Sequence, residues 1–284
     1  MYQSLPLDQI RQKIDGLDNQ IHDLLLERAD LIMAISEEKK KAGIQIVQPA
    51  REARMIRRLM TRHRGPLPEE TIVRIWRELV SSVSLLQTGL SVAVYVPSEV
   101  PEYWDMARDY FGSVLPMQRA SSTSETLDLV RSGNVTFAVI PFPDKGLSDP
   151  CWNGLIQDIE HEKGLAVIQR LPYGQKENYN YDRHPALVVA QSKFGESGDD
   201  CSLCYLVNEQ ARTKEEIISI LKESGVTEFD LYGDGVLIII SIPEYFEGTS
   251  KKIVDLRDKM FSIGIRIGLL GGYPSPLSYK EYRK

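Results

Sequence analysis

The chain has 284 residues, of which 42% are hydrophobic and 26% are charged, and its formal net charge is −6. This composition excludes an intrinsically disordered protein, and the length suffices for two or three small domains. We expect neither a membrane span nor a signal peptide, because no apolar stretch is long enough to cross a bilayer and the first residues lack a basic start and an apolar core. Three cysteines predict a reducing, cytoplasmic location without a disulfide framework.

The first predicted helix, residues 7–42, has an apolar face that a single arginine interrupts. Apolar residues recur three and four positions apart, at Leu7, Ile10, Ile14, Leu17, Ile21, Leu24, Leu31 and Ile35. Arg28 takes the position between Leu24 and Leu31 where another apolar residue would continue the pattern. A guanidinium on the packed side of a helix is costly unless an anion meets it. Arg28 is therefore paired with a fixed carboxylate or receives a charged ligand.

The length of this helix predicts a second copy of the chain. A helix over residues 7–42 is about 50 Å long, which is more than a small domain can cover. Arg28 and Lys39 share one face, whereas Arg11 lies roughly 25 Å from Arg28 along the axis. An antiparallel partner helix would return Arg11 to the same pocket. We therefore expect a homodimer with composite sites, and the alternative is that Arg11 and Lys39 are solvated charges on a coiled coil.

Two further helices are predicted at about residues 50–63 and 68–88. Glu52 falls on the same face as Ile56 and Leu59, and so points toward the apolar side. The apolar positions predicted for the third helix end beside Gln87, and they are Ile72, Trp76, Leu79, Val83 and Leu86. Residues 1–90 hold fourteen basic and twelve acidic residues. Bases on an apolar face of a near-neutral segment favour a small anionic ligand, and no basic stripe of a nucleic-acid-binding protein is present.

From residue 91 the pattern changes to alternating strands and helices. Strands are predicted at 91–96, 114–118, 135–140, 165–170 and 186–190, with helices at 103–111, 124–132 and 153–162, which indicates an α/β layer. Residues 202–270 follow a βαββαβ order, which fits a ferredoxin-like α+β sandwich. Gly233–Gly235 is predicted to form a hairpin turn, and Gly271-Gly272 a turn after the last strand. Cys201 and Cys204 face opposite sides of a strand, so we expect buried thiols and no metal site.

The first 90 residues resemble the all-helical class of chorismate mutase. The resemblance rests on Arg11 in the sequence IRQKID, Leu17-Asp18, Glu27-Arg28, Lys39, the pair Arg51-Glu52, and Gln87. Two positions depart from the family: Gln48 stands where an acidic residue is usual, and Val83 where a serine is usual. The resemblance implies an intertwined all-α dimer that converts chorismate to prephenate in aromatic amino-acid synthesis, with no metal and no cofactor.

That reaction is a unimolecular rearrangement, so a site needs to hold two carboxylates and to stabilise charge on the breaking ether oxygen. The resemblance implies that Lys39, Gln87 and Arg28 act in catalysis. It also implies a substrate-binding set of Arg11, Arg28, Lys39, Gln48, Arg51, Glu52 and Gln87.

The remainder is similar to the prephenate dehydratase and ACT segments of bifunctional proteins of phenylalanine synthesis. We expect an all-α unit at 1–90, a shortened dehydratase-like α/β unit at 91–197, and an ACT-like unit at 198–284. After Val139–Pro141 the dehydratase Glu-Asn-Ser is replaced by Phe142-Pro143-Asp144, and the Thr-Arg-Phe signature is absent from the sequence. The ACT-like end lacks the Gly-Ala-Leu and Glu-Ser-Arg-Pro segments of that family. We therefore expect both units to be inactive or regulatory, with an aromatic amino acid as a candidate effector.

Three other functions stay open at this point. The first is a bifunctional mutase and dehydratase, and the second is a related lyase that removes pyruvate from isochorismate. The third is a non-catalytic helical dimerisation module with an α/β ligand sensor.

Overall fold

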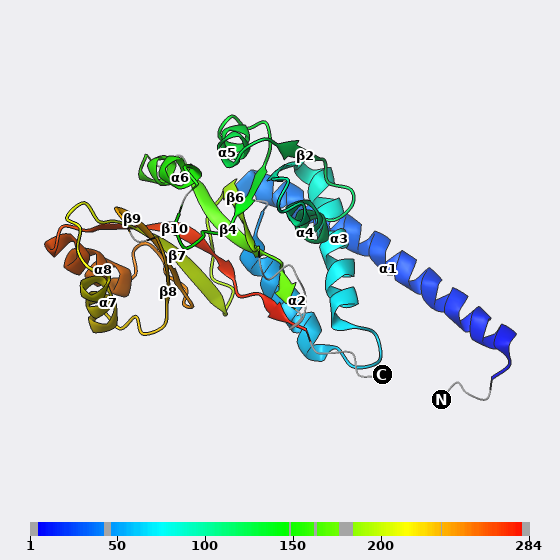
Figure 1. Cartoon of the computed structure of the whole chain (residues 1–284). Coiled ribbons are helices and arrows are strands. Elements are labelled where there is room, and N and C mark those ends of the chain that lie inside the picture. The colour runs from blue at the N-terminus through cyan, green and yellow to red at the C-terminus, as the bar shows by residue number, and fades with distance from the viewer. Residues whose placement is uncertain are drawn as a thin grey trace.

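The computed structural model describes residues 5–42, 47–147, 149–161, 164–175, 184–233 and 235–279, without the side chains at 40, 42 and 85–88. Three helices at one side of the molecule adjoin a long mixed sheet, and the first helix projects from the body (Figure 1). These helices are α1 (Leu7–Ala42), α2 (Pro49–Arg62) and α3 (Glu69–Thr88). All three lie within two residues of the predicted ranges.

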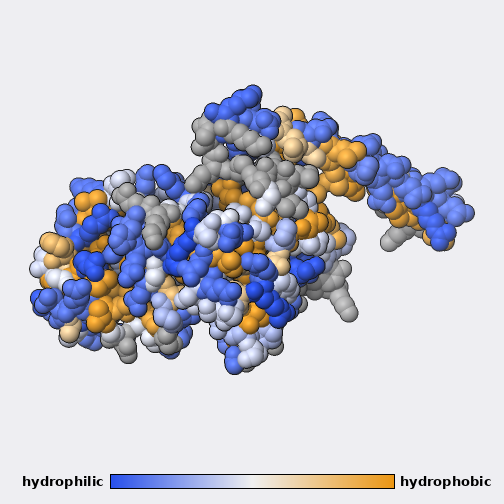
Figure 2. Space-filling model, turned by 90° about the horizontal axis from the view of Figure 1, so that it is seen from above, coloured by the Kyte–Doolittle hydropathy of each residue, from blue (hydrophilic) through white to orange (hydrophobic). Residues whose placement is uncertain are grey.

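Helix α1 leaves most of its apolar face uncovered within one chain. Leu17 is 56% exposed, and Leu24 and Leu31 are 63% and 60% exposed. Figure 2 shows apolar residues gathered along α1 where it leaves the body, beside polar residues on its other side. A row of exposed leucines of this length is unfavourable in water. Because the single chain does not cover this face, a second helix against α1 is still expected.

The main sheet has nine strands in the order β2-β1-β3-β6-β4-β10-β7-β9-β8. In chain order its strands are β1 (Val92–Tyr95), β2 (Met117–Ala120), β3 (Phe137–Pro141), β4 (Leu165–Leu171), β6 (Ala186–Gln191), β7 (Asp200–Val207), β8 (Asp230–Tyr232), β9 (Leu237–Ile242) and β10 (Arg266–Pro274). Strands β1, β2 and β3 are parallel, and β6 runs antiparallel to both of its neighbours. A separate small sheet pairs β5 (Gly174–Gln175) with β11 (Leu277–Ser278). The strand expected at 114–118 lies slightly later, as β2.

The last four strands of this order carry the expected ferredoxin-like topology. Strands β10, β7, β9 and β8 are neighbours in that order, and every pair is antiparallel. The helices α7 (Lys214–Glu223) and α8 (Lys251–Ser262) pack against this part of the sheet. Strand β10 also pairs in parallel with β4 at Gly271 and Val167, so the sheet continues without a break from the α/β part into the ferredoxin-like part.

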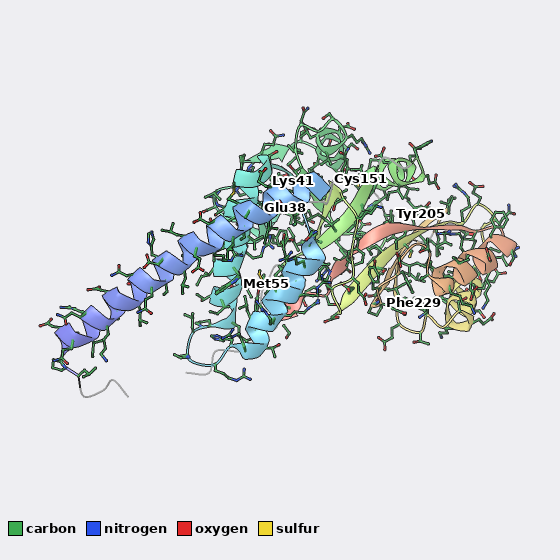
Figure 3. All side chains as sticks on the ribbon, turned by 180° about the vertical axis from the view of Figure 1, so that it is seen from behind. Glu38, Lys41, Met55, Cys151, Tyr205 and Phe229 are labelled. Atoms are coloured by element: carbon green, nitrogen blue, oxygen red, sulfur yellow. The ribbon has the colours of Figure 1, made fainter. Side chains whose placement is uncertain are left out.

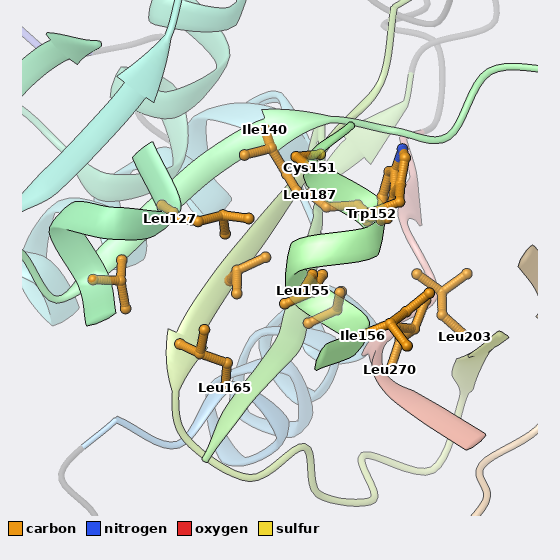
Figure 4. Close-up of a cluster of buried hydrophobic side chains, with 14 of the residues drawn as sticks. Leu127, Ile140, Cys151, Trp152, Leu155, Ile156, Leu165, Leu187, Leu203 and Leu270 are labelled. Carbon is orange, nitrogen blue, oxygen red and sulfur yellow. The ribbon is translucent and has the colours of Figure 1, made fainter. Parts of the chain in front are cut away.

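Three buried clusters hold the layers together. On one face, α5 (Thr123–Arg131) and α6 (Cys151–Glu160) contribute Leu127, Trp152 and Leu155 to the first cluster (Figure 4). The opposite face of β1 and β3 packs against α4 (Glu102–Phe111), with Ile56 of α2 and Val73 of α3 in the same cluster. The third cluster lies under α7 and α8. As predicted, Cys201 and Cys204 are buried on opposite sides of β7, in the first and third clusters.

Helix α2 is fixed to the segment between β6 and β7 by two arginines. Arg57 donates from Nη1 to the backbone oxygen of Ser197 at 3.0 Å and to its hydroxyl at 2.8 Å, and from Nη2 to the backbone oxygen of Asp199. Arg54 donates to the backbone oxygen of Glu196. Because α2 also carries Arg51 and Glu52, these bonds set the position of two predicted site residues relative to the sheet.

The predicted turn at Gly271-Gly272 is wrong, because both glycines lie inside β10. The register between β10 and β7 shifts between Leu269 and Gly271, and Gly271 has φ of +115°. A Cβ atom at Gly271 would lie 2.2 Å from the backbone oxygen of Val167. The glycine therefore permits a bulge and a close approach of two strands rather than a turn. For the predicted hairpin turn at 233–235, Asp234 lies outside the described residues, while the flanking strands β8 and β9 are antiparallel as expected.

Replacing Gly271 by alanine should disrupt the junction of β10 with β4. The added methyl group would meet backbone atoms of Val167, which cannot rotate away, and the positive φ disfavours any L side chain. We expect Gly271→Ala to lower the free energy of unfolding by more than about 2 kcal/mol in urea denaturation. Gly248→Ala is the matched control, since its Cβ meets nothing within 4 Å. Equal stability of the two variants would contradict the described junction.

Candidate active site

A cavity of about 590 Å³ lies between α1, α2 and α3. Its charged lining consists of five basic side chains and one carboxylate, all from α1 and α2: Arg28, Lys39, Arg51, Arg54, Arg58 and Glu52. Apolar side chains, including Leu31, Ile35, Met55 and Val83, complete the wall. Figure 3 shows Met55 on α2 beside the C-terminal half of α1. A cavity whose charged side chains are mostly basic and whose other walls are apolar is suited to a small anion with an apolar body.

Helix geometry explains how α1 delivers two of these cations. Arg28 and Lys39 are separated by three turns of α1, so both side chains reach the same cavity. Both are half-buried. Lys41, in contrast, is exposed and forms an ion pair with Glu38 at 2.7 Å, near the end of the helix (Figure 3).

Helix α2 contributes its first turn to the cavity. Gln48 is the N-cap residue, and its side chain makes no capping hydrogen bond. Pro49 occupies the first helical position, where a missing N–H costs nothing. Arg51 and Glu52 follow within the first turn, and both line the cavity together with Gln48. Five of the seven predicted site residues are therefore brought together within one chain: Arg28, Lys39, Gln48, Arg51 and Glu52.

The cavity disfavours its own positive charges. Burial lowers the pKa of Arg28 below its ordinary value. Burial also lowers the pKa of Lys39, and the neighbouring Arg51 lowers it further, while Glu52 acts in the opposite direction. Each of these shifts is a cost of holding the cation in place, and an anion in the cavity would relieve it.

Glu52 accepts a hydrogen bond from Arg77, a residue outside the cavity lining that the sequence analysis missed. Arg77 of α3 is 4% exposed, and its Nη1 donates to Oε2 of Glu52 at 2.6 Å. Arg77 also donates from Nε to the backbone oxygen of Tyr110 at 2.8 Å, and its guanidinium lies 3.8 Å from the centre of the Tyr110 ring. The signal was present in the spacing, because Arg77 falls four residues from both Val73 and Ser81, and all three are buried.

One predicted site residue, Arg11, lies outside the cavity of its own chain. Arg11 is exposed near the far end of α1, where it lies 3.7 Å from Asp8. The side chain of Gln87 lies outside the described residues. Val83 lines the cavity as an apolar residue. Within the described ranges no group of three or more His, Cys, Asp or Glu side chains is arranged to hold a metal ion. No described helix is long and apolar enough to span a membrane.

The type II chorismate mutase family matches residues 10–88. Similar proteins include the bifunctional chorismate mutase/prephenate dehydratase of Stutzerimonas stutzeri, which is 31% identical over 140 residues, covering 48% of this chain and 38% of that protein. The corresponding protein of Neisseria gonorrhoeae is 36% identical over 87 residues, which cover 31% of this chain and 24% of that protein. The chain thus spans less than half the length of these bifunctional relatives. The chorismate mutase of Methanocaldococcus jannaschii is 36% identical over 84 residues, which cover 28% of this chain and 83% of that protein.

Solved structures with partial likeness include two prephenate dehydratases. That of Streptococcus mutans is 14% identical with a TM-score of 0.42, covering 67% of this chain and all of that chain. That of Staphylococcus aureus is 9% identical with a TM-score of 0.44, covering 65% and 100%. A likeness at this level supports no conclusion about chemistry. The family match covers residues 10–88, and the chain covers 83% of the Methanocaldococcus chorismate mutase at 36% identity. These two findings show that this chain belongs to the type II chorismate mutase family.

Proposed function

We propose that this protein catalyses the rearrangement of chorismate to prephenate in the cavity between α1, α2 and α3. The observation that carries the proposal is a cavity lined by five cations and one carboxylate, in which Arg28 and Lys39 are half-buried. Membership of the type II family supports it. Chorismate has one carboxylate and one hydroxyl on a small ring and a second carboxylate on its enolpyruvyl ether arm, and these charges and polar groups complement this lining.

The chemistry needs binding and electrostatic stabilisation rather than a nucleophile or a proton shuttle. Arg28 and Arg51 suit the carboxylates, because a planar guanidinium gives a carboxylate two parallel hydrogen bonds. Lys39 and Gln87 would stabilise the charge that develops on the ether oxygen. Glu52 would accept a hydrogen bond from the ring hydroxyl, with Gln48 beside it. The apolar Val83 gives Arg51 no hydroxyl neighbour at that position.

The active form in this proposal is a homodimer with composite sites. The uncovered leucines of α1 require a long apolar partner surface, and a second copy of α1 provides one of equal length. Arg11 lies outside the cavity of its own chain. In an antiparallel arrangement the partner's Arg11 would reach the cavity that holds Arg28. The site would then gain a further guanidinium, beside those of Arg28 and Arg51, for the two carboxylates.

For the rest of the chain we propose units at 91–197 and 198–284 that carry no dehydration chemistry. Phe142-Pro143-Asp144 stands where the dehydratase family has its Glu-Asn-Ser. The ring of Phe142 packs against Tyr232 and Tyr273 at centroid distances of 5.4 and 6.3 Å. An aromatic amino acid remains the candidate effector. Repeating the mutase assay with phenylalanine, tyrosine and tryptophan in turn tests this. All three cysteines are free and buried, which supports a cytoplasmic location.

A bifunctional mutase and dehydratase is the second candidate, and the bifunctional relatives favour it because their aligned 140 residues exceed the 10–88 segment. Formation of phenylpyruvate from added prephenate would establish it. Removal of pyruvate from isochorismate would instead establish the related lyase. A non-catalytic dimerisation module would leave chorismate, prephenate and isochorismate unchanged.

Removing either of the two cations that α1 contributes to the cavity should slow the reaction. We expect Lys39→Ala and Arg28→Ala each to reduce kcat/KM for chorismate by at least about 10²-fold, as for the loss of an oxyanion-stabilising donor. Product chromatography and the loss of chorismate absorbance measure the rate. Arg62→Ala is the control, since Arg62 is exposed on α2 outside the cavity lining. Full activity of both cavity variants would refute the assigned roles.

The pH dependence should show a flat acidic side and an early alkaline fall. The proposed mechanism requires no group to gain or lose a proton between about pH 5 and 7, so kcat/KM should stay nearly constant there. Burial and then Arg51 lower the pKa of Lys39, so its ammonium is lost at a lower pH than the 10.5 of an ordinary lysine. We expect kcat/KM to fall with an apparent pKa below 10.5. In Lys39→Arg, which keeps its charge, the fall should move to higher pH. A fall at the same pH in both proteins would assign it to another group.

Mixing two inactive variants tests the composite site. A dimer formed from one Arg11→Ala chain and one Arg28→Ala chain has one site with both arginines and one site with neither. Refolded mixtures should therefore recover about a quarter of the wild-type activity if the chains pair at random. Each variant refolded alone is the control. Recovery of no activity by mixtures of correctly sized dimers would contradict composite sites.

A further inference from the structure

The Glu52 carboxylate lies between two environments, and only one of them is the cavity. On one side it lines the cavity between α1, α2 and α3. On the other side its Oε2 accepts from Nη1 of Arg77 at 2.6 Å. A carboxylate offers about four acceptor positions on two oxygens, so the bond from Arg77 leaves further acceptor positions for a ligand.

Arg77 is held rigidly by groups that have no other role in the proposed mechanism. Its Nε donates to the backbone oxygen of Tyr110, and its guanidinium stacks 3.8 Å from the centre of the Tyr110 ring and 5.7 Å from that of Tyr173. A small cavity of about 30 Å³, near the size of one water, adjoins Arg77, Glu52 and Tyr110. Because Arg77 is buried, its guanidinium is shielded from bulk water. Its charge-assisted bond to Glu52 is strong and directional in this environment.

We propose that Arg77 is a positioning residue that holds the carboxylate of Glu52 turned so that a substrate hydroxyl in the cavity meets an acceptor. This inference rests on the proposed mutase function. The arginine does not touch the substrate, because Arg77 is absent from the cavity lining. Its effect passes through Glu52.

The placement of Tyr110 extends the consequence beyond the helical segment. Tyr110 belongs to α4, which follows the segment matched by the mutase family, and it packs in the cluster beneath β1 and β3. Contacts therefore link Tyr110 to Arg77 and Arg77 to Glu52. Through them, the position of Glu52 in the proposed active site depends on the α/β part of the protein.

A double-mutant cycle on the full-length protein separates positioning from structural support. We expect Arg77→Met to reduce kcat/KM for chorismate by about 10- to 100-fold, because a misplaced carboxylate loses its alignment with the hydroxyl. Arg77→Lys keeps a cation but loses the planar fork, so it should recover part of that loss. In a Glu52→Gln background the same Arg77→Met change should alter kcat/KM by less than about threefold, since the group that Arg77 positions is already replaced.

Arg74→Met is the matched control, because Arg74 is exposed on the same helix and pairs with Asp109 at 3.1 Å outside the cavity. It should leave kcat/KM unchanged. If Arg77→Met reduces kcat/KM by the same factor with and without Glu52, Arg77 is a structural residue and the assignment is overturned. If the unsubstituted protein does not convert chorismate at all, the proposed function fails first and this inference fails with it.

Discussion

Positive charge concentrated between two helices is the constraint on which the rest of the structure depends. Five basic side chains and one carboxylate share a cavity of about 590 Å³, and the carboxylate is also bonded to Arg77. Burial lowers the pKa of both Arg28 and Lys39, which shows that the cavity holds these cations at a cost. A cation buried in this way is costly unless an anion meets it. A dianion of small size relieves the cost and gains orientation from the same contacts.

Helix α2 is the element through which the two parts of the protein meet. Its first turn presents Arg51 and Glu52 to the cavity, while Arg57, farther along, is bonded to the segment between β6 and β7. Arg77 and Tyr110 make a second connection between the helices and the α/β part. The sheet itself is continuous from the α/β part into the ferredoxin-like part through β4 and β10. The helices that line the cavity are therefore bonded to the α/β part at both α2 and α3. Because the sheet is continuous, a displacement of the ferredoxin-like part can be transmitted to α2 through these contacts.

The site residues that share a helix could be predicted from the sequence, and those that depend on tertiary packing could not. The eleven-residue spacing of Arg28 and Lys39 was sufficient to place both on one face, and in the structure both line the same cavity. Arg77 was missed because the apolar pattern of α3 was assigned to the positions of Trp76 and Leu79, both of which are only partly buried. The fully buried stripe of α3 is set by contact with α4, which follows it in the chain. In β10, the pair Gly271-Gly272 indicated a turn, but the absence of a side chain at Gly271 instead admits the backbone of Val167.

The most direct test of the account is a crystal structure of the protein with bound prephenate, the product of the proposed reaction. The account predicts prephenate in the cavity between α1 and α2, with a carboxylate within hydrogen-bond distance of Arg28 and its hydroxyl beside Glu52. Prephenate bound elsewhere in the protein, with the side chains of Arg28 and Lys39 turned into solvent, would contradict the claim that these cations form an anion site.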